Sequence, residues 1–239
     1  MNDRVLILTG YSEEYTNAVV GDNSFAEVFE LTLPSKLRYV QKHKYDILVL
    51  CKFGIDSESI IHHSNIEAMR CVRALDMLKH YDVVMWIDGD AIITNSAYSI
   101  DKFMLDDHCF YASYDWNVDP NTNNYFSFGN FILKNNKNIE QFKSALYNMD
   151  KMIPNFDRSV WGNEQYGLNI INRFYNLENK NIIKILETKY LNSVPSFMGW
   201  DSTRHIVTPW TSDSFLAHLT GSSNKNRIDV LVNKLSEYL

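Results

Sequence analysis

The sequence predicts an α/β fold in which a largely parallel sheet is covered by helices on both faces. In the first half of the chain, short runs of apolar residues alternate with segments of helical periodicity. Strands that are apolar throughout are typical of parallel sheets buried on both faces. The 239 residues are 45% hydrophobic and 22% charged, as in an ordinary globular protein. No internal repeat, low-complexity tract or linker divides the chain, so we expect one domain over residues 1–239.

The first half is expected to contain three buried strands and two helices. The strands are RVLILTG, YDILVLCKF and DVVMWIDGD. Between the first two, FAEVFELTLP predicts extended chain and SKLRYVQKHK predicts a helix with Ser35 as its N-cap. A long helix is predicted over about residues 59–80, where apolar residues recur at helical spacing.

The second half has a less regular pattern. CFYASYDW and YFSFGNFILKN predict two strands, and IIKILETKYLN predicts another. Helices are expected over 138–152 and 163–176, and an amphipathic helix over about 226–238.

Charge and cysteine content exclude some classes of protein. The formal net charge of −6 argues against a general nucleic-acid binder, which needs a basic surface to meet phosphates. The three cysteines are widely spaced, without metal-binding spacing, and fit a reducing compartment. The apolar run near the N-terminus is too short for a signal peptide, and no stretch approaches the 18 or so apolar residues of a membrane span. The chain is therefore expected to be cytoplasmic, or the soluble part of an anchored protein.

The most informative stretch is VVMWIDGDAIITN, in which two aspartates flank a glycine where a buried strand should end. Residues i and i+2 of a strand point to the same side, so Asp88 and Asp90 are expected to project together from the carboxyl end of the strand. Open α/β sheets bind ligands at that end. Two close carboxylates repel each other unless a cation lies between them, and a divalent metal meets this need. Gly89 would let a ligand approach the backbone closely.

The acidic pair has other interpretations. An isolated Asp-x-Asp is more often a solvated turn after a strand. An EF-hand loop fails, because it needs an oxygen ligand where Ile92 stands and a glycine where Ile93 stands. A metal-dependent phosphohydrolase with Asp88 as nucleophile is the main competing enzyme class, although its motif would usually open the chain.

A histidine supplies a candidate third metal ligand. FLAHLTG is a short apolar segment that places His218 three residues before Gly221. Neutral imidazole is a good ligand for Mn²⁺. The small backbone at Gly221 would let a diphosphate come close. Taken alone, such a histidine is more often a satisfied core or surface residue.

Five segments in order resemble one family of enzymes: KLRYVQKHKYDILV, MRCVRALDMLKHYDVVMWIDGDAIITN, FGNFILKN, WGNEQYGLNII and FLAHLTG. They are similar to family 34 of the glycosyltransferases, the group of fungal galactosyl- and mannosyltransferases and plant xyloglucan xylosyltransferases. A more distant likeness is to the glycogenin-type family. The resemblance implies a Rossmann-like GT-A fold with a mixed, mainly parallel central sheet. It also implies a nucleotide-binding half over about 1–95 and an acceptor-binding half over about 96–239, closed by the His218 segment and a C-terminal helix.

The resemblance implies transfer of a sugar from a nucleotide-diphosphate sugar, with a UDP-sugar favoured, to a hydroxyl of a glycan or glycoconjugate. It further implies retention of anomeric configuration and a need for Mn²⁺ or Mg²⁺. By position, Asp88, Asp90 and His218 would hold the metal. Glu164 and Gln165 would lie beside the transferred sugar, where Glu164 is the candidate nucleophile or the group that stabilises an oxocarbenium-like state.

Further positions would bind the donor nucleotide. The resemblance implies that Thr9 and Tyr11 face the base and ribose, and that Arg70 approaches the ribose or diphosphate. Gly89, Gly221 and Lys225 would lie along the diphosphate.

The chain departs from the family at three places. Ser127-Phe128-Gly129 lacks an asparagine that usually contacts the sugar. Glu164 stands where the family has aspartate, and Asn224 stands where a lysine is expected on the diphosphate. The first departure leaves open a nucleotide-sugar-binding module without turnover.

Overall fold

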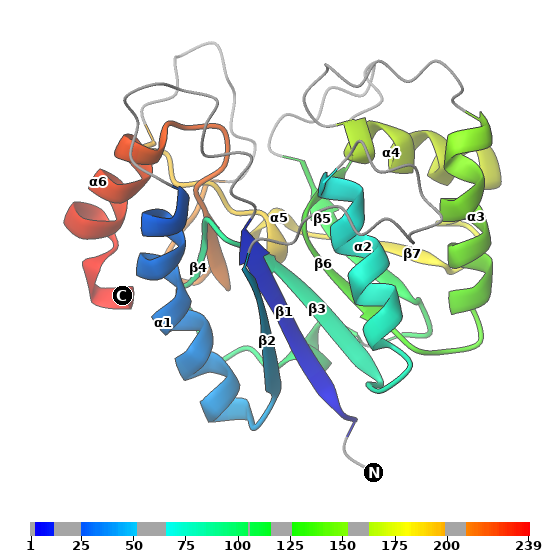
Figure 1. Cartoon of the computed structure of the whole chain (residues 1–239), viewed down its shortest axis with the longest axis horizontal. Coiled ribbons are helices and arrows are strands. Elements are labelled where there is room, and N and C mark those ends of the chain that lie inside the picture. The colour runs from blue at the N-terminus through cyan, green and yellow to red at the C-terminus, as the bar shows by residue number, and fades with distance from the viewer. Residues whose placement is uncertain are drawn as a thin grey trace.

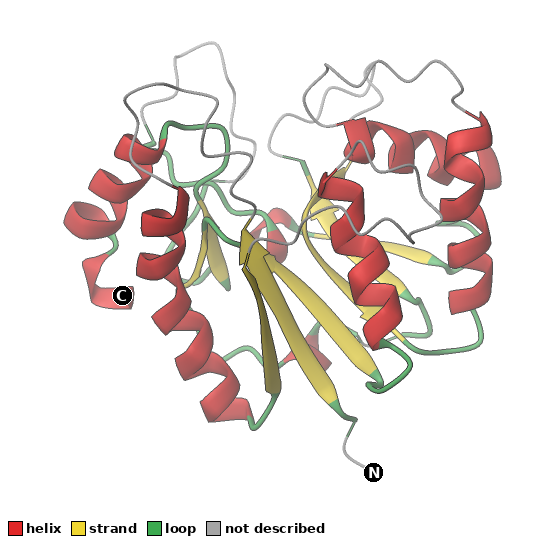
Figure 2. Cartoon of the chain, viewed as in Figure 1, coloured by secondary structure: helices red, strands yellow, loops and turns green. Residues whose placement is uncertain are grey.

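The computed structural model describes residues 3–11, 25–51, 66–104, 106–115, 126–152, 163–198 and 209–239, and their strands form a six-stranded sheet and a smaller one (Figures 1 and 2). The large sheet has the order β2-β1-β3-β6-β5-β7. Its strands are β1 (Val5–Tyr11), β2 (Asp46–Cys51), β3 (Val83–Asp88), β5 (Phe110–Tyr114), β6 (Phe126–Lys134) and β7 (Ile183–Leu186). Among these six described strands, β6 alone is antiparallel to its neighbours, so the predicted mixed, mainly parallel sheet is confirmed.

Two short strands far apart in the sequence form the second sheet. They are β4 (Ala91–Ile93) and β8 (Leu216–His218), and they pair in antiparallel fashion. Because β4 follows β3 after a turn of two residues, the small sheet fastens the C-terminal part of the chain next to the end of a central strand.

Helices cover both faces of the large sheet (Figure 1). They are α1 (Phe25–His43), α2 (Ile66–Met77), α3 (Ile139–Met152), α4 (Asn163–Tyr175), α5 (Thr188–Leu191) and α6 (Asn224–Lys234), with 3-10 turns η2 (Ile100–Lys102) and η3 (Ser236–Tyr238). Among the described residues, none of these helices combines the length and the apolar character needed to cross a membrane.

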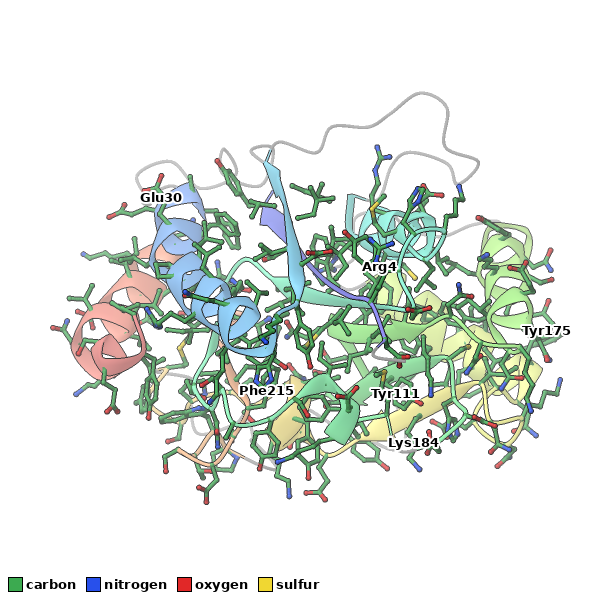
Figure 3. All side chains as sticks on the ribbon, turned by 90° about the horizontal axis from the view of Figure 1, so that it is seen from below. Arg4, Glu30, Tyr111, Tyr175, Lys184 and Phe215 are labelled. Atoms are coloured by element: carbon green, nitrogen blue, oxygen red, sulfur yellow. The ribbon has the colours of Figure 1, made fainter. Side chains whose placement is uncertain are left out.

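The alternation of side chains along β1 divides the core into two layers. Leu6 and Leu8 pack with apolar residues of α2, α3 and α4 on one face. Val5 and Ile7 pack on the other face with residues of α1, β4 and α5, and this layer includes Tyr111 and Phe215, both labelled in Figure 3. A third apolar cluster joins α1, the small sheet and α6. Helix α6 therefore packs on α1 and the small sheet.

Helix α1 begins ten residues earlier than the sequence predicted, so the expected extended chain over FAEVFELTLP was wrong. Pro34 lies inside the helix, where it lacks the N–H that would bond one turn back. Val28, Phe29 and Thr32 nevertheless bury the same helical face as Tyr39, so tertiary packing overrides the local cost of proline.

Ser35 is not a helix N-cap. It is buried within α1, where its hydroxyl donates to the carbonyl of Thr32 (2.7 Å) and accepts from the backbone N–H of Ile93 in β4 (3.1 Å). The residue that suggested a helix start therefore links the helix to the strand that follows the acidic pair.

The other predicted elements are present with shifted ends. The prediction that YDILVLCKF is buried was wrong, because β2 ends the strand order of the sheet and Leu48 is 39% exposed. Helix α2 ends at Met77, and residues 59–65 of the expected helix lie outside the described residues. IIKILETKYLN is a strand only over Ile183–Leu186, after which the chain turns into the short helix α5.

Candidate metal centre

The two aspartates stand at the end of a central strand, as the sequence predicted, but only one of them belongs to that strand. Asp88 is the last residue of β3, which lies between β1 and the antiparallel β6. Gly89 and Asp90 form the turn that leads into β4. The carboxylates therefore come together through a turn, and not through the alternation of a continuous strand.

The small sheet brings the histidine to this turn. His218 pairs with Ala91 across β4 and β8, and the backbone N–H of Leu219 donates to the carbonyl of Asp90 (3.1 Å). The backbone N–H of His218 donates to Ser193 (2.8 Å), the second residue after α5. These bonds fix the histidine beside the turn.

The ligand atoms of the three residues converge. His218 Nε2 lies 3.6 Å from Asp88 Oδ2 and 3.4 Å from Asp90 Oδ1, and one ligand atom from each residue lies within 4.8 Å of the others. The side chains of Asp88, Asp90 and His218 are 17%, 7% and 4% exposed, so the cluster is nearly enclosed by protein.

In each of the three side chains, the polar atom that does not face the other two contacts a separate partner residue. Asp88 Oδ1 accepts from Arg70 (2.6 Å) and from the indole N–H of Trp86 (2.7 Å). Asp90 Oδ2 is 3.2 Å from a guanidinium nitrogen of Arg227 in α6. His218 Nδ1 is 2.8 Å from the amide oxygen of Asn192. The converging atoms are those that these partners leave free.

The residues present fit a divalent ion. Two carboxylate oxygens and an imidazole nitrogen are a donor set that suits Mn²⁺ and, less well, Mg²⁺. Gly129 of β6 leaves the space, because a Cβ there would lie 2.6 Å from His218 Cε1 and 2.8 Å from Asp88 Oδ2. A side chain at that position would push the histidine and the first aspartate out of place.

The sequence pattern of the galactosyl transferase GMA12/MNN10 family, family 34 of the glycosyltransferases, matches residues 1–123, more than half of the 239 residues. The chain belongs to this family.

Solved structures agree with the family at the level of the fold. A glycosyltransferase involved in the glycosylation of the major capsid of PBCV-1 has a TM-score of 0.62 and 14% identity, over 96% of this chain and 98% of that one. GlyE of Streptococcus pneumoniae TIGR4 has a TM-score of 0.57 and 15% identity, over 99% of this chain and 64% of that one. The galactosyltransferase LgtC, solved with donor and acceptor sugar analogues, has a TM-score of 0.51 and 14% identity, over 90% and 87%. The predicted GT-A fold is thereby confirmed, and no curated protein sequence gives a significant match.

In this family 34 chain, the cluster holds charges that shift one another's pKa. Burial alone would raise the pKa of Asp88, but Arg70 and then His218 outweigh it and lower that pKa. Arg227 and His218 likewise lower the pKa of Asp90 against the effect of burial. Burial disfavours the charged imidazole, yet Asp90 and Asp88 raise the pKa of His218 to about 9. At neutral pH both carboxylates are ionised and the imidazole is protonated.

A buried lysine lies beneath the turn. Lys36 of α1 is completely buried, and its ammonium donates to Thr32 Oγ1 (3.0 Å) and to the carbonyl of Gly89 (3.4 Å). The Thr32 hydroxyl donates to the same carbonyl at 2.5 Å. Burial lowers the pKa of Lys36 to about 7, although Asp90 and Asp88 act in the opposite direction. The carbonyl of Gly89 in the turn therefore accepts hydrogen bonds from two buried side chains of α1, Thr32 and Lys36.

The predicted nucleotide-binding residues are spread around this centre. Arg70 contacts Asp88 directly. Thr9 is completely buried in β1, and its hydroxyl has no hydrogen-bond partner within the described part of the chain. Tyr11 is partly buried at the end of β1, with its ring 5.2 Å from that of Phe29. That Thr9 and Tyr11 face the base and ribose stays a prediction.

The remaining predicted residues lie on two helices and one turn. Gly221 has a φ of 71°, which favours glycine, and is exposed beyond β8. Lys225 is exposed in the first turn of α6. Glu164 and Gln165 lie in the first turn of α4, and their side chains are outside the described residues.

Sequence reasoning missed several residues of this centre. Trp86 could have been found, because it precedes Asp88 by two residues on the same side of a strand. Arg227 was passed over in favour of Lys225, two positions earlier. Lys36 had a weaker signal, one turn from Thr32 on a helix that was mispredicted. No sequence signal marked Asn192.

Proposed function

We propose that this chain is a metal-dependent retaining glycosyltransferase. It transfers a sugar from a nucleotide-diphosphate sugar, with a UDP-sugar as the favoured donor, to a hydroxyl of a glycan or glycoconjugate. Mn²⁺ or Mg²⁺ is held by Asp88, Asp90 and His218. Membership of a glycosyltransferase family supports transfer over phosphate hydrolysis with Asp88 as nucleophile.

One observation carries the metal assignment. Asp88 Oδ2, Asp90 Oδ1 and His218 Nε2 converge while a separate partner holds the other polar atom of each side chain. Ligands whose outer partners are in place need little rearrangement to bind an ion. A solvated turn after a strand would not require a buried imidazole from β8, a strand that is distant in the sequence.

The cations around the acidic pair fit a diphosphate. When bound, the ion would neutralise negative charge that develops on the leaving diphosphate. Arg70 and Arg227 have side chains 11% and 13% exposed and bring guanidinium groups to the edge of the cluster. Helix α6 adds its N-terminus, where the Ser223 hydroxyl accepts from the backbone N–H of Asn226 (3.2 Å). Backbone N–H groups at such a terminus attract phosphate oxygens, and Lys225 lies within this turn.

The two halves of the chain have separate tasks in this proposal. Residues of about 1–95 hold the nucleotide, and residues of about 96–239 bind the acceptor and close the metal centre through β8 and α6. Figure 1 shows α6 and α4 on opposite sides of the end of β1. A donor bound at Asp88 and Asp90 would therefore extend its sugar into the region between α6 and α4.

Retention of configuration is assigned to the start of α4. Either Glu164 attacks the anomeric carbon in the first of two displacements, or it stabilises an oxocarbenium-like state while the acceptor attacks from the front face. Gln165 is proposed to hold the transferred sugar. Glu164→Gln would stop a double displacement and leave donor binding intact.

Thermal denaturation with a panel of nucleotide sugars, with and without Mn²⁺, tests the proposal. A specific donor should stabilise the folded chain only with the metal, by about 2.7 kcal/mol at a hundred times its Kd. Product analysis with the stabilising donor then separates the function classes. Nucleoside diphosphate and a new glycoside indicate a transferase, inorganic phosphate indicates a phosphohydrolase, and binding without product indicates a module without turnover. Stabilisation that is indifferent to Mn²⁺ would contradict metal dependence.

A further inference from the structure

We propose that Asn192 is a positioning residue that selects the metal-binding tautomer of His218. The inference rests on the proposed metal centre and adds to it a residue that no motif in the sequence marked. A neutral histidine carries its one ring proton on either nitrogen, and only the nitrogen without the proton can bind a metal. Something must therefore place the proton on Nδ1.

The orientation of the Asn192 amide is set by its second partner. Its nitrogen Nδ2 donates to the carbonyl of Tyr114 at the end of β5 (3.1 Å). A flipped amide would place its oxygen against that carbonyl, and two acceptors would face each other inside the protein, since Asn192 is 1% exposed. The amide oxygen is therefore the atom that faces His218.

That orientation decides the tautomer. The amide oxygen of Asn192 is 2.8 Å from His218 Nδ1, and an amide oxygen only accepts hydrogen bonds. Nδ1 must carry the proton, and in the neutral ring the lone pair is then on Nε2. This is the nitrogen that faces Asp88 Oδ2 and Asp90 Oδ1. Without Asn192, the two carboxylates would favour the opposite tautomer, because an N–H on Nε2 could donate to them.

The backbone around Asn192 fixes the same geometry. Its N–H donates to the carbonyl of Thr188 in α5 (2.8 Å), and the next residue, Ser193, accepts from the backbone N–H of His218 (2.8 Å). Two consecutive residues thus hold both the main chain and the ring of the histidine. Helix α5 has four residues, and its C-terminal end presents these two acceptors to β8.

Two substitutions separate this role from plain packing. Asn192→Leu keeps most of the volume and removes the acceptor. Asn192→Asp keeps an acceptor facing Nδ1, although its second oxygen faces the Tyr114 carbonyl and should lower stability. We expect Asn192→Leu to weaken the binding of Mn²⁺ alone, measured by calorimetry, roughly 10–100-fold, the usual effect of losing an outer partner of a metal ligand. Asn192→Asp should bind Mn²⁺ at least as well as the wild type. Equal losses in both variants would overturn the inference.

Asn169→Leu is the matched control. Asn169 is also completely buried and exchanges two hydrogen bonds with the backbone of Phe126, away from the cluster. It should lose stability and keep its Mn²⁺ affinity. If Asn192→Leu does not fold, a loss of Mn²⁺ affinity in folded Asn192→Asp would still overturn the inference.

Nitrogen NMR of the imidazole in the metal-free protein gives a readout independent of metal. At a pH where the His218 ring is neutral, the wild type should show the proton on Nδ1, and Asn192→Leu should shift it toward Nε2. An unchanged tautomer would overturn the inference. If Mn²⁺ affinity is indifferent to Asn192 but falls in His218→Ala, only the tautomer role fails. If the wild type itself does not bind Mn²⁺, the proposed metal centre fails as well.

Discussion

In the described part of the molecule, histidine lies close to aspartate at two places, which differ in burial and in the number of carboxylates. His108 Nδ1 lies 2.6 Å from Asp106 Oδ1, closer than His218 lies to either carboxylate of the metal centre. Lys184 also pairs with Asp106 at 3.3 Å, and Tyr111 donates to it at 3.0 Å. Figure 3 labels Tyr111 and Lys184, which face each other on β5 and β7. In the shorter contact the carboxylate belongs to a side chain that is 35% exposed.

The difference lies in burial and in the number of carboxylates. The His108 side chain is 11% exposed, but those of Asp106 and Lys184 are 35% and 46% exposed, so the single carboxylate is open to solvent. At the metal centre two carboxylates share an enclosed space, and distant segments supply their partners. The pKa of Asp106 is also lowered, with its hydrogen bonds to His108 and Tyr111 outweighing the effect of burial, so a lowered aspartate pKa does not by itself mark a metal site. The convergence of several buried ligand atoms is the observation that supports the candidate metal centre.

The largest expected effect follows from removing one carboxylate. Asp88→Asn or Asp90→Asn should abolish Mn²⁺-dependent donor binding, a greater loss than the roughly 10–100-fold cost of changing an outer partner. An asparagine still accepts a hydrogen bond from Arg70 or Arg227, so the chain should remain folded. Asp106→Asn is the matched control and should bind donor and metal normally. Calorimetry with Mn²⁺ and a nucleoside diphosphate measures the effect, and unchanged binding in either first variant would show that the acidic pair is not the metal site.

An intermediate effect is expected from the histidine. His218→Ala should weaken Mn²⁺-dependent binding by a few kcal/mol at most, since water can fill one coordination position. His108→Ala should leave it unchanged. A His218 substitution that lowers stability while the folded protein keeps its metal affinity would indicate a core histidine.

The same histidine sets the pH dependence of metal binding. The metal must displace the imidazole proton, and the folded-state pKa of His218 is raised to about 9 from its ordinary value of 6.5. Apparent Mn²⁺ affinity should therefore fall as pH drops below about 9, by about tenfold for each pH unit. If Mn²⁺ affinity began to fall only below about pH 6.5, the pKa of a free histidine, the raised pKa of His218 would be contradicted. In the metal-free protein the sign is opposite, because the raised pKa contributes stability below pH 6.5 that is lost as pH rises through about 9.

Local pattern was enough to predict most of the fold. Apolar runs identified the strands, and β3 with its acidic end was predicted within two residues. They did not distinguish buried β1 and β3 from β2, which is partly exposed at the end of the strand order. Helix α1 was missed at its N-terminal end because FAEVFELTLP contains a proline and several β-favouring residues, while the reason for its helical form is burial against distant elements. The split between β7 and α5 was missed for a similar reason.

The metal centre could be predicted only in part. Asp88 and Asp90 carry a local pattern, and His218 was singled out in the FLAHLTG segment before the family resemblance implied the same role for it. Asn192 and Arg227 reach the centre through α5 and α6, whose positions depend on the packing of the whole chain. The outer partners of these ligands come from distant parts of the sequence. They therefore form no local motif with the ligands that they hold.

The smallest expected effect on metal binding concerns Lys36, the ammonium beneath the acidic turn. Its folded-state pKa is lowered to about 7 from 10.5, because burial disfavours the charge. A lowered pKa means that stability present above pH 10.5 is lost as pH falls toward 7. Lys36→Met keeps the apolar stem and cannot be protonated, so it should be more stable than the wild type at pH 7 by a few kcal/mol, because a pKa difference of one between folded and unfolded chain corresponds to about 1.4 kcal/mol. The advantage should shrink steadily as pH rises toward 10.5.

Denaturant unfolding of metal-free Lys36→Met and wild type across this pH range measures the difference, and effects of His218 largely cancel between them. Lys42→Met, on the exposed side of the same helix, is the matched control for the loss of a lysine. Mn²⁺ affinity of Lys36→Met should rise only a few-fold, since removing a nearby positive charge relieves repulsion of the ion through a partly screened distance. A difference in unfolding free energy that is constant with pH would show that the Lys36 ammonium is not desolvated. The site around Lys36, Thr32 and the Gly89 carbonyl would then have to contain water.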